Sequence, residues 1–243
     1  KSITMPEIAE AIDRVIAGPE KKSRIISDEE RKVTAYHEAG HALTAWMLPN
    51  ADKVHKISII ARGGMGGYTR LLPEDRHLWS VDQFKDMLAT SLGGRLAEEI
   101  VFSQITTGAS NDLENATKIS REMITRYGMS KKLGPRTFGK GEEMVFLGRE
   151  ISDQRDYSDK IAELIDDEVK DLIEGAYKTA KAIITKNRKR LDAVAKYLIE
   201  HESVEGEELE RLFESKLPRK TAKKRKAINI IKSGSRPKPA AAT

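Results

Sequence analysis

A His-Glu-x-x-His pattern spans residues 37 to 41 and supplies the residue types that metal-assisted hydrolysis requires. His37 and His41 are four residues apart, so on a helix both imidazoles lie on one face and can bind a single Zn²⁺. Glu38 projects about 100° round the helix from His37, where it can reach water on the metal without being a ligand itself. A zinc ion with three protein ligands keeps a fourth position for water and lowers the pKa of that water to about 7. The pattern therefore predicts Glu38 as a general base for the hydrolysis of peptide bonds.

A catalytic zinc site needs a third protein ligand, and several carboxylates are candidates. His41 is not followed by the Gly and His of the extended pattern H-E-x-x-H-x-x-G-x-x-H, so the third ligand comes from another segment. Glu98 and Glu99 lie on a predicted second helix, and Asp112 stands at a predicted helix start after a Gly-containing loop. Spacing alone does not choose between these carboxylates.

The elements that must position these residues are mainly helical. Apolar periodicity and capping residues predict helices over about 4–17, 27–48, 80–102, 112–127, 156–186, 187–201 and 206–214. Alternating β-branched residues predict a strand over 54–60, and a Gly-rich turn leads to a second short strand over 68–72. The predicted fold class is therefore mainly α, with a small β-hairpin or sheet beside the helix that carries the His-Glu-x-x-His pattern.

Composition excludes several other kinds of site. The 243 residues contain no Cys, which excludes a disulfide scaffold, a thiol nucleophile and iron–sulfur clusters. No G-x-x-x-x-G-K-[ST] pattern occurs, so we expect this chain not to bind ATP. The longest charge-free apolar stretch, near residues 39–51, is shorter than the roughly 18 apolar residues of a membrane span.

The basic net charge comes from the end of the chain. The formal net charge is +5, but residues 216–243 hold ten Lys and Arg and no acids, so the other 215 residues carry −5. A nucleic-acid-binding fold usually has its basic surface on the folded part. We therefore expect 216–243 to be a disordered basic tail, and we expect no nucleic-acid partner.

Three segments, in this order, resemble the peptidase domain of the FtsH family of membrane-anchored AAA+ zinc metalloproteases: residues 35–43, 93–100 and 107–113. Shorter matches flank them at 18–23, 54–60, 127–130, 133–135 and 146–149. The resemblance covers roughly residues 5–213. Several such blocks in one order are specific, so we expect a zinc peptidase fold of this type.

The resemblance implies one Zn²⁺ per chain, with Asp112 as the third ligand beside His37 and His41. Glu98 and Glu99 then become candidates for supporting the site, for example by accepting a hydrogen bond from a ligand histidine. A rival class, an inactive peptidase-like assembly module, would lack a ligand or the base, and this sequence has all of them.

The resemblance also implies a domain organisation. Residues 1–26 would be the end of a preceding ATPase module with its linker, 27–215 the zinc peptidase domain, and 216–243 the tail. The full-length protein would be an ATP-dependent homo-hexamer on the cytoplasmic side of the bacterial inner membrane, or at the equivalent organelle membrane. Its membrane contact would come only from segments outside this sequence.

The predicted hairpin is the expected place for a polypeptide substrate, unfolded or delivered by an unfoldase. Extended peptides commonly add as a strand to an exposed sheet edge, and both predicted strands follow the His-Glu-x-x-His helix closely in sequence. Glycines in the turn would let a peptide backbone approach closely. The substrate-binding candidates are Gly66, Gly67, Tyr68 and Thr69.

Overall fold

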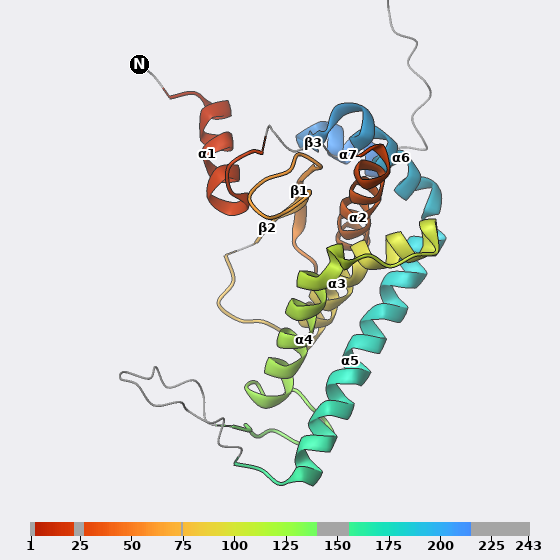
Figure 1. The fold of residues 1–243 in the computed structure, drawn as a ribbon. Coiled ribbons are helices and arrows are strands. Elements are labelled where there is room, and N and C mark those ends of the chain that lie inside the picture. The colour runs from red at the N-terminus through yellow and green to blue at the C-terminus, as the bar shows by residue number, and fades with distance from the viewer. Residues whose placement is uncertain (1–2, 22–26, 74, 140–155, 215–243) are drawn as a thin grey trace, which may run out of the picture.

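The computed structural model describes residues 3–21, 27–73, 75–139 and 156–214. Its helices are α1 (Met5–Ala17), α2 (Asp28–Met47), α3 (Val81–Phe102), α4 (Ser110–Thr125), α5 (Asp159–Lys186), α6 (Arg188–His201) and α7 (Gly206–Glu214), with a 3-10 turn η1 (Thr107–Ala109). Its strands are β1 (Lys53–Ser58), β2 (Tyr68–Leu72) and β3 (Ser203–Glu205) (Figure 1). The predicted class, mainly α with a small sheet, is confirmed. The predicted tail, 216–243, lies outside the described residues, as does most of the predicted linker.

The small sheet has three antiparallel strands in the order β2-β1-β3. β1 and β2 form the predicted hairpin, although β1 ends at Ser58 rather than at residue 60. The sequence analysis did not predict β3, whose three residues pair with β1 through Ile57 and Val204. Because β1 lies in the middle of the sheet that the structure describes, β2 and β3 form its edges, and of the two predicted strands β2 is the one that offers an edge to a peptide.

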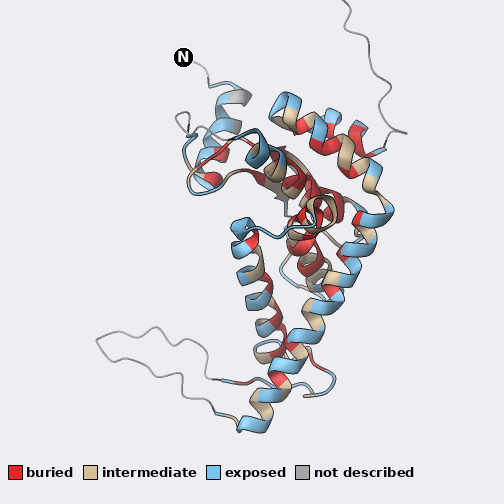
Figure 2. Cartoon of the chain, turned by 45° about the vertical axis from the view of Figure 1, so that its right-hand side comes forward, coloured by how far each residue is buried: buried red, intermediate tan, exposed pale blue. Residues whose placement is uncertain are grey.

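α2 is the central helix of the fold. Its start is fixed by Ser27, whose hydroxyl accepts a hydrogen bond from the N–H of Glu30 at 3.1 Å. It packs against α3 and α6, and it also contacts β1, α5 and β2. The core around it includes the fully buried Leu43, Ile57, Leu96, Leu198 and Phe213. Figure 2 shows the buried residues gathered at the centre of the molecule, while the outer faces of α4 and α5 are exposed.

Two glycines set the crossing of α2 and α3. A Cβ atom on Gly40 would clash with the carbonyl oxygen of Gly93, and one on Gly93 would lie 2.6 Å from the carbonyl oxygen of Gly40. The two backbones are therefore in direct contact, which offsets the low helix propensity of glycine at these positions. This close crossing places the histidines of α2 beside the next turn of α3.

None of the helices among the described residues combines the length and the apolar character that a membrane crossing requires.

Candidate metal centre

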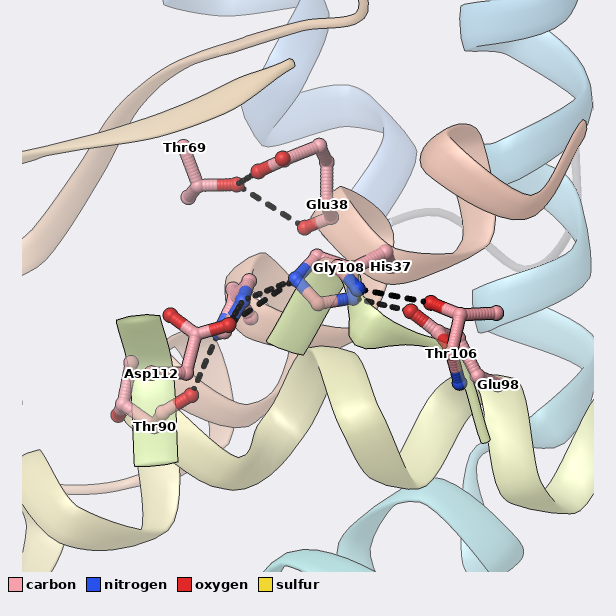
Figure 3. A network of polar contacts seen from close by, with 9 residues as sticks. His37, Glu38, Thr69, Thr90, Glu98, Thr106, Gly108 and Asp112 are labelled. Atoms are coloured by element: carbon pink, nitrogen blue, oxygen red, sulfur yellow. Dashed lines mark hydrogen bonds and ion pairs between the residues drawn. The ribbon is translucent and has the colours of Figure 1, made fainter. Parts of the chain in front are cut away.

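His37 and His41 of α2 meet through their Nε2 atoms, which lie 3.0 Å apart. The Nδ1 atom of each ring faces an oxygen. His37 Nδ1 lies 2.6 Å from Oε1 of Glu98, and His41 Nδ1 lies 2.8 Å from the carbonyl oxygen of Thr90 (Figure 3). Carbonyl and carboxylate oxygens accept hydrogen bonds, so each neutral imidazole carries its proton on Nδ1 and leaves a lone pair on Nε2.

Asp112 joins this pair from another helix. It lies in the first turn of α4, which begins at Ser110 rather than at residue 112 because η1 leads directly into it. Its Oδ2 is 3.2 Å from Nε2 of His37 and 3.4 Å from Nε2 of His41. The three ligand atoms lie within 4.8 Å of one another, so the structure brings together the three residues that the sequence analysis named as metal ligands.

This donor set fits a zinc ion. Two imidazole lone pairs and a carboxylate oxygen point into one small space, and such groups repel one another unless a cation lies between them. Imidazole nitrogen and carboxylate oxygen are ligands that Zn²⁺ uses in catalytic sites, where three protein ligands leave the fourth position open. Across the described ranges, no other cluster of three His, Asp or Glu side chains meets the same distance limit.

The same acceptors bind a proton when no metal competes. Burial disfavours the charged form of His37, but its hydrogen bonds with Asp112 and Glu98 outweigh burial and raise the pKa of His37 to about 10. Burial alone would raise the pKa of Asp112, yet its hydrogen bonds with the two histidines hold that pKa well below its usual range. The cluster of His37, His41 and Asp112 therefore favours a cation, either a proton or a metal ion, between its ligand atoms.

Glu98 and Glu99 are neighbours in α3 with different surroundings. Glu98 is 1% exposed, and besides the contact with His37 it accepts a hydrogen bond from the N–H of Thr106 at 3.1 Å. It therefore touches one candidate ligand and also holds the segment that leads to α4. Glu99 instead accepts a hydrogen bond from the hydroxyl of Tyr177 in α5 at 2.7 Å, outside the metal-ligand group.

Glu38 points toward β2 and Thr69 (Figure 3). The hydroxyl of Thr69 lies 2.8 Å from Oε2 of Glu38 and 3.0 Å from the backbone carbonyl oxygen of the same residue. Burial raises the pKa of Glu38, and charge on the two histidines opposes this only in part. A carboxylate with a raised pKa is a stronger base than one in water, which suits proton transfer near neutral pH.

Sequence reasoning missed two contributions to this geometry. Thr90 supplies a backbone carbonyl oxygen to His41, and no side-chain pattern reveals such a contact. Gly94 leaves room for the rings, because a Cβ there would lie 2.6 Å from Nε2 of His37. Two adjacent glycines within a helix, Gly93 and Gly94, are compatible with close packing, but the sequence does not indicate that the second one faces the imidazoles.

An open cleft of about 1280 Å³ contains the candidate ligands and Glu38. It is also lined by the four substrate-binding candidates, Gly66, Gly67, Tyr68 and Thr69. A Cβ on Gly67 would lie 3.0 Å from Cγ of Glu38, so this part of the turn passes directly over the acid. Tyr68 is 8% exposed, and burial together with an interaction with Asp13 of α1 raises the pKa of its hydroxyl.

Comparison with known proteins agrees with this geometry. Residues 24–212 match the model of "Peptidase family M41". The chain is 58% identical, over 90% of its length, to "ATP-dependent zinc metalloprotease FtsH 1" of Sphaerobacter thermophilus, and 56% identical over 90% to the protein of the same name from Thermomicrobium roseum. It is 51% identical over 87% of its length to "ATP-dependent zinc metalloprotease FtsH" of Thermotoga maritima. It spans 34%, 34% and 35% of these three relatives, or about a third of their length.

Proposed function

Because the chain belongs to peptidase family M41, we propose that it is a zinc metalloendopeptidase domain, which hydrolyses peptide bonds of unfolded or unfoldase-delivered polypeptides. The observation that carries the proposal is the convergence of His37, His41 and Asp112 in one cleft with the buried Glu38. The names of the relatives, which are zinc metalloproteases, support zinc as the metal and peptide hydrolysis as the reaction.

The zinc ion would be held by Nε2 of His37, Nε2 of His41 and Oδ2 of Asp112. When bound, zinc supplies Lewis-acid chemistry: it makes water a stronger acid and polarises the carbonyl of the scissile peptide. The surrounding residues keep the two rings in the tautomer that frees Nε2. Glu98 accepts a hydrogen bond from Nδ1–H of His37, and the Thr90 carbonyl oxygen accepts one from Nδ1–H of His41.

Glu38 would act as the general base. Its carboxylate takes a proton from the attacking water and passes it to the leaving amine nitrogen. Burial raises the pKa of Glu38, which makes its carboxylate a stronger base toward this proton. The Thr69 hydroxyl holds Oε2 of the carboxylate in one orientation inside the cleft.

β2 would bind the substrate as an added strand. It is an edge of the sheet, and Thr69 of this strand contacts Glu38, so a peptide paired along β2 would run past the base. Gly66 and Gly67 carry no side chains that would obstruct the peptide backbone at this point. Main-chain hydrogen bonds would give affinity with little demand on sequence, which suits unfolded polypeptides.

The proposal extends to a longer protein. Residues 1–26 would be the end of an ATPase module and its linker, 27–215 the peptidase domain and 216–243 a basic tail. The whole would act as an ATP-dependent homo-hexamer on the cytoplasmic side of a membrane, while this chain itself binds neither ATP nor nucleic acid. Two facts support this: the chain spans about a third of its relatives, and their names include dependence on ATP.

Glu38→Gln tests the proposal, because the amide keeps the shape of the side chain and cannot take the proton. We expect one zinc per chain, measured by elemental analysis, and cleavage of an unfolded casein substrate slowed by at least about 10²-fold. Glu99→Gln is the matched control and should keep both zinc and activity, since Glu99 contacts α5. Intact cleavage by zinc-loaded Glu38→Gln would remove this residue from the mechanism. A zinc-loaded wild type that does not cleave casein would contradict the proposed activity itself.

A further inference from the structure

α1 is held against the sheet by charged side chains. Several of its apolar residues are exposed, among them Met5 at 75% and Val15 at 86%, whereas Asp13 is 1% exposed. Oδ2 of Asp13 lies 2.7 Å from Nζ of Lys56 in β1, and Oδ1 lies 2.6 Å from Nη1 of Arg70 in β2. A buried carboxylate is costly unless it is paired in this way, so Asp13 and the two cations fix one another's positions.

Tyr68 of β2 also interacts with Asp13, and burial together with this interaction raises the pKa of the Tyr68 hydroxyl. Successive side chains of a strand point to opposite faces. Tyr68 and Arg70 therefore face α1, and Thr69 between them faces α2, where its hydroxyl lies 2.8 Å from Glu38. β2 is thus fixed on one face by α1 and contacts the candidate base with the other, and Figure 1 shows α1 and α2 on the two sides of the hairpin.

The segment that follows α1 is tied to the same hairpin through its backbone. The N–H of Lys21 donates to the carbonyl of Ala61 at 2.9 Å, and the N–H of Gly63 donates to the carbonyl of Pro19 at 3.1 Å. Both α1 and residues 19–21 precede residue 24, where the match to the peptidase family begins. A segment outside the matched family region is therefore in direct contact with the strand beside the catalytic centre.

We propose that Asp13 is a positioning residue for peptide hydrolysis: it fixes β2 through Tyr68 and Arg70, and β2 then holds Glu38 through Thr69. The proposal rests on the proposed function of the site, and it makes activity depend on the docking of α1. Asp13 is not a catalytic residue, because it lies on the opposite face of β2 from Glu38 and contacts no candidate metal ligand.

We call the chain of contacts from Asp13 through β2 and Thr69 to Glu38 the relay. A double-mutant cycle between Asp13 and Thr69 tests it, because these two residues act on each other only through β2. Asp13→Asn should lower kcat for a casein-derived peptide about 10-fold in the wild-type background, as displacement of a catalytic group by a fraction of an ångström does. In a Thr69→Val background Asp13→Asn should lower kcat by less than about 2-fold, because the contact between the Thr69 hydroxyl and Glu38 is already absent. The same fold-loss in both backgrounds would overturn the proposal.

Hydrogen exchange of the zinc-loaded full chain gives a second measurement that needs no activity. Amides of residues 68–72 should exchange faster in Asp13→Asn, and unchanged exchange there would also overturn the proposal. Glu10→Gln is the matched control, because this residue of α1 pairs with Arg62 and not with β2; exchange in β2 and kcat should stay at wild-type values. If the wild type proves inactive, the proposed function fails while the exchange result still tests the relay.

Arg70→Gln provides a second variant in case Asp13→Asn does not fold. It removes the charged contact to β2 and leaves the pair of Asp13 with Lys56 intact. Circular dichroism reports folding, and the cycle with Thr69→Val and the exchange of 68–72 are repeated on this variant. We expect the same non-additive loss of kcat, and additivity would contradict the relay.

Discussion

At the scale of single residues, three carboxylates near the histidines have different contacts, so removing each charge has a different predicted result. Asp112→Asn keeps the size of the side chain but removes the anion 3.2 Å from His37 and 3.4 Å from His41. We expect zinc affinity, measured by competition with a chelating dye, to fall by more than the 10–100-fold typical of a lost supporting contact.

Glu98→Gln and Glu99→Gln provide the comparison. Glu98 supports His37, so its substitution should weaken zinc binding by about 10–100-fold, whereas Glu99→Gln should leave it unchanged. Full zinc affinity in Asp112→Asn, with loss in either glutamate variant, would move the third ligand to α3.

The proposed zinc ion would compete with a proton for His37, which gives zinc binding a pH dependence of known sign. The pKa of His37 in the metal-free chain is raised to about 10, so this residue is protonated at pH 7. Zinc binds the neutral imidazole, so uptake at pH 7 should release about one proton, and affinity should weaken as pH falls. Titration calorimetry in two buffers of different ionisation enthalpy measures the released proton. A binding enthalpy independent of the buffer would contradict the raised pKa.

The residues of the site were predictable to different degrees. His37, Glu38 and His41 lie within one helical turn, so their arrangement follows from local geometry alone. The choice between Asp112 and Glu98 depends on how α3 and α4 approach α2, and no spacing within the chain encodes that approach; the family resemblance, not the pattern, indicated Asp112. The interaction of Tyr68 with Asp13 likewise could not be predicted from the sequence, because it joins α1 to a residue 55 positions later in the chain.

At the scale of elements, the sequence predicted the long helices well because each has a strong local pattern. α5, predicted over about 156–186, was found at Asp159–Lys186, and Ser80 with Gln83 forms the capping box that starts α3. β3 was not predicted, because its three residues are too few for alternation to appear and its pairing with β1 is long-range. Whether β1 was an edge strand therefore could not be decided from the sequence.

The glycines of the α2–α3 crossing yield a prediction about packing. Gly40→Ala should destabilise the chain by about 1–3 kcal/mol or more, because its Cβ would clash with the Gly93 carbonyl and overpacking outweighs the better helix propensity. Gly175→Ala in α5 is the control: it is exposed, its Cβ would meet open space, and we expect a gain of about 1 kcal/mol. Urea unfolding measures both free energies. A Gly40→Ala chain as stable as the wild type would show that the helices can separate at this point.

At the scale of the whole molecule, the proposed metal would join two helices, α2 and α4, that both pack on α3 and α5. His37 and His41 belong to α2, which also packs on α6, and Asp112 belongs to α4. α2 and α4 thus meet through the candidate ligands and through their shared contacts with α3 and α5. Glu98 of α3 reinforces this junction, since it contacts both His37 and Thr106. Metal binding should therefore stabilise the whole domain rather than one loop.

Zinc removal tests this coupling. A ligand that binds only the folded state raises the free energy of unfolding by about 2.7 kcal/mol when its free concentration is 100 times its Kd. Wild-type chain at that free zinc concentration should therefore unfold at a higher urea midpoint than chain treated with a chelator, with the same dependence of free energy on urea. Asp112→Asn at the same free zinc concentration should gain much less, because the ion then has two imidazole ligands on α2 and no anchor on α4. An equal gain in both proteins would mean that zinc does not join the two helices through Asp112. If zinc changed only the hydrogen exchange of amides near residues 107–112 in the wild type and left the urea midpoint unchanged, the effect of the metal would be limited to the start of α4.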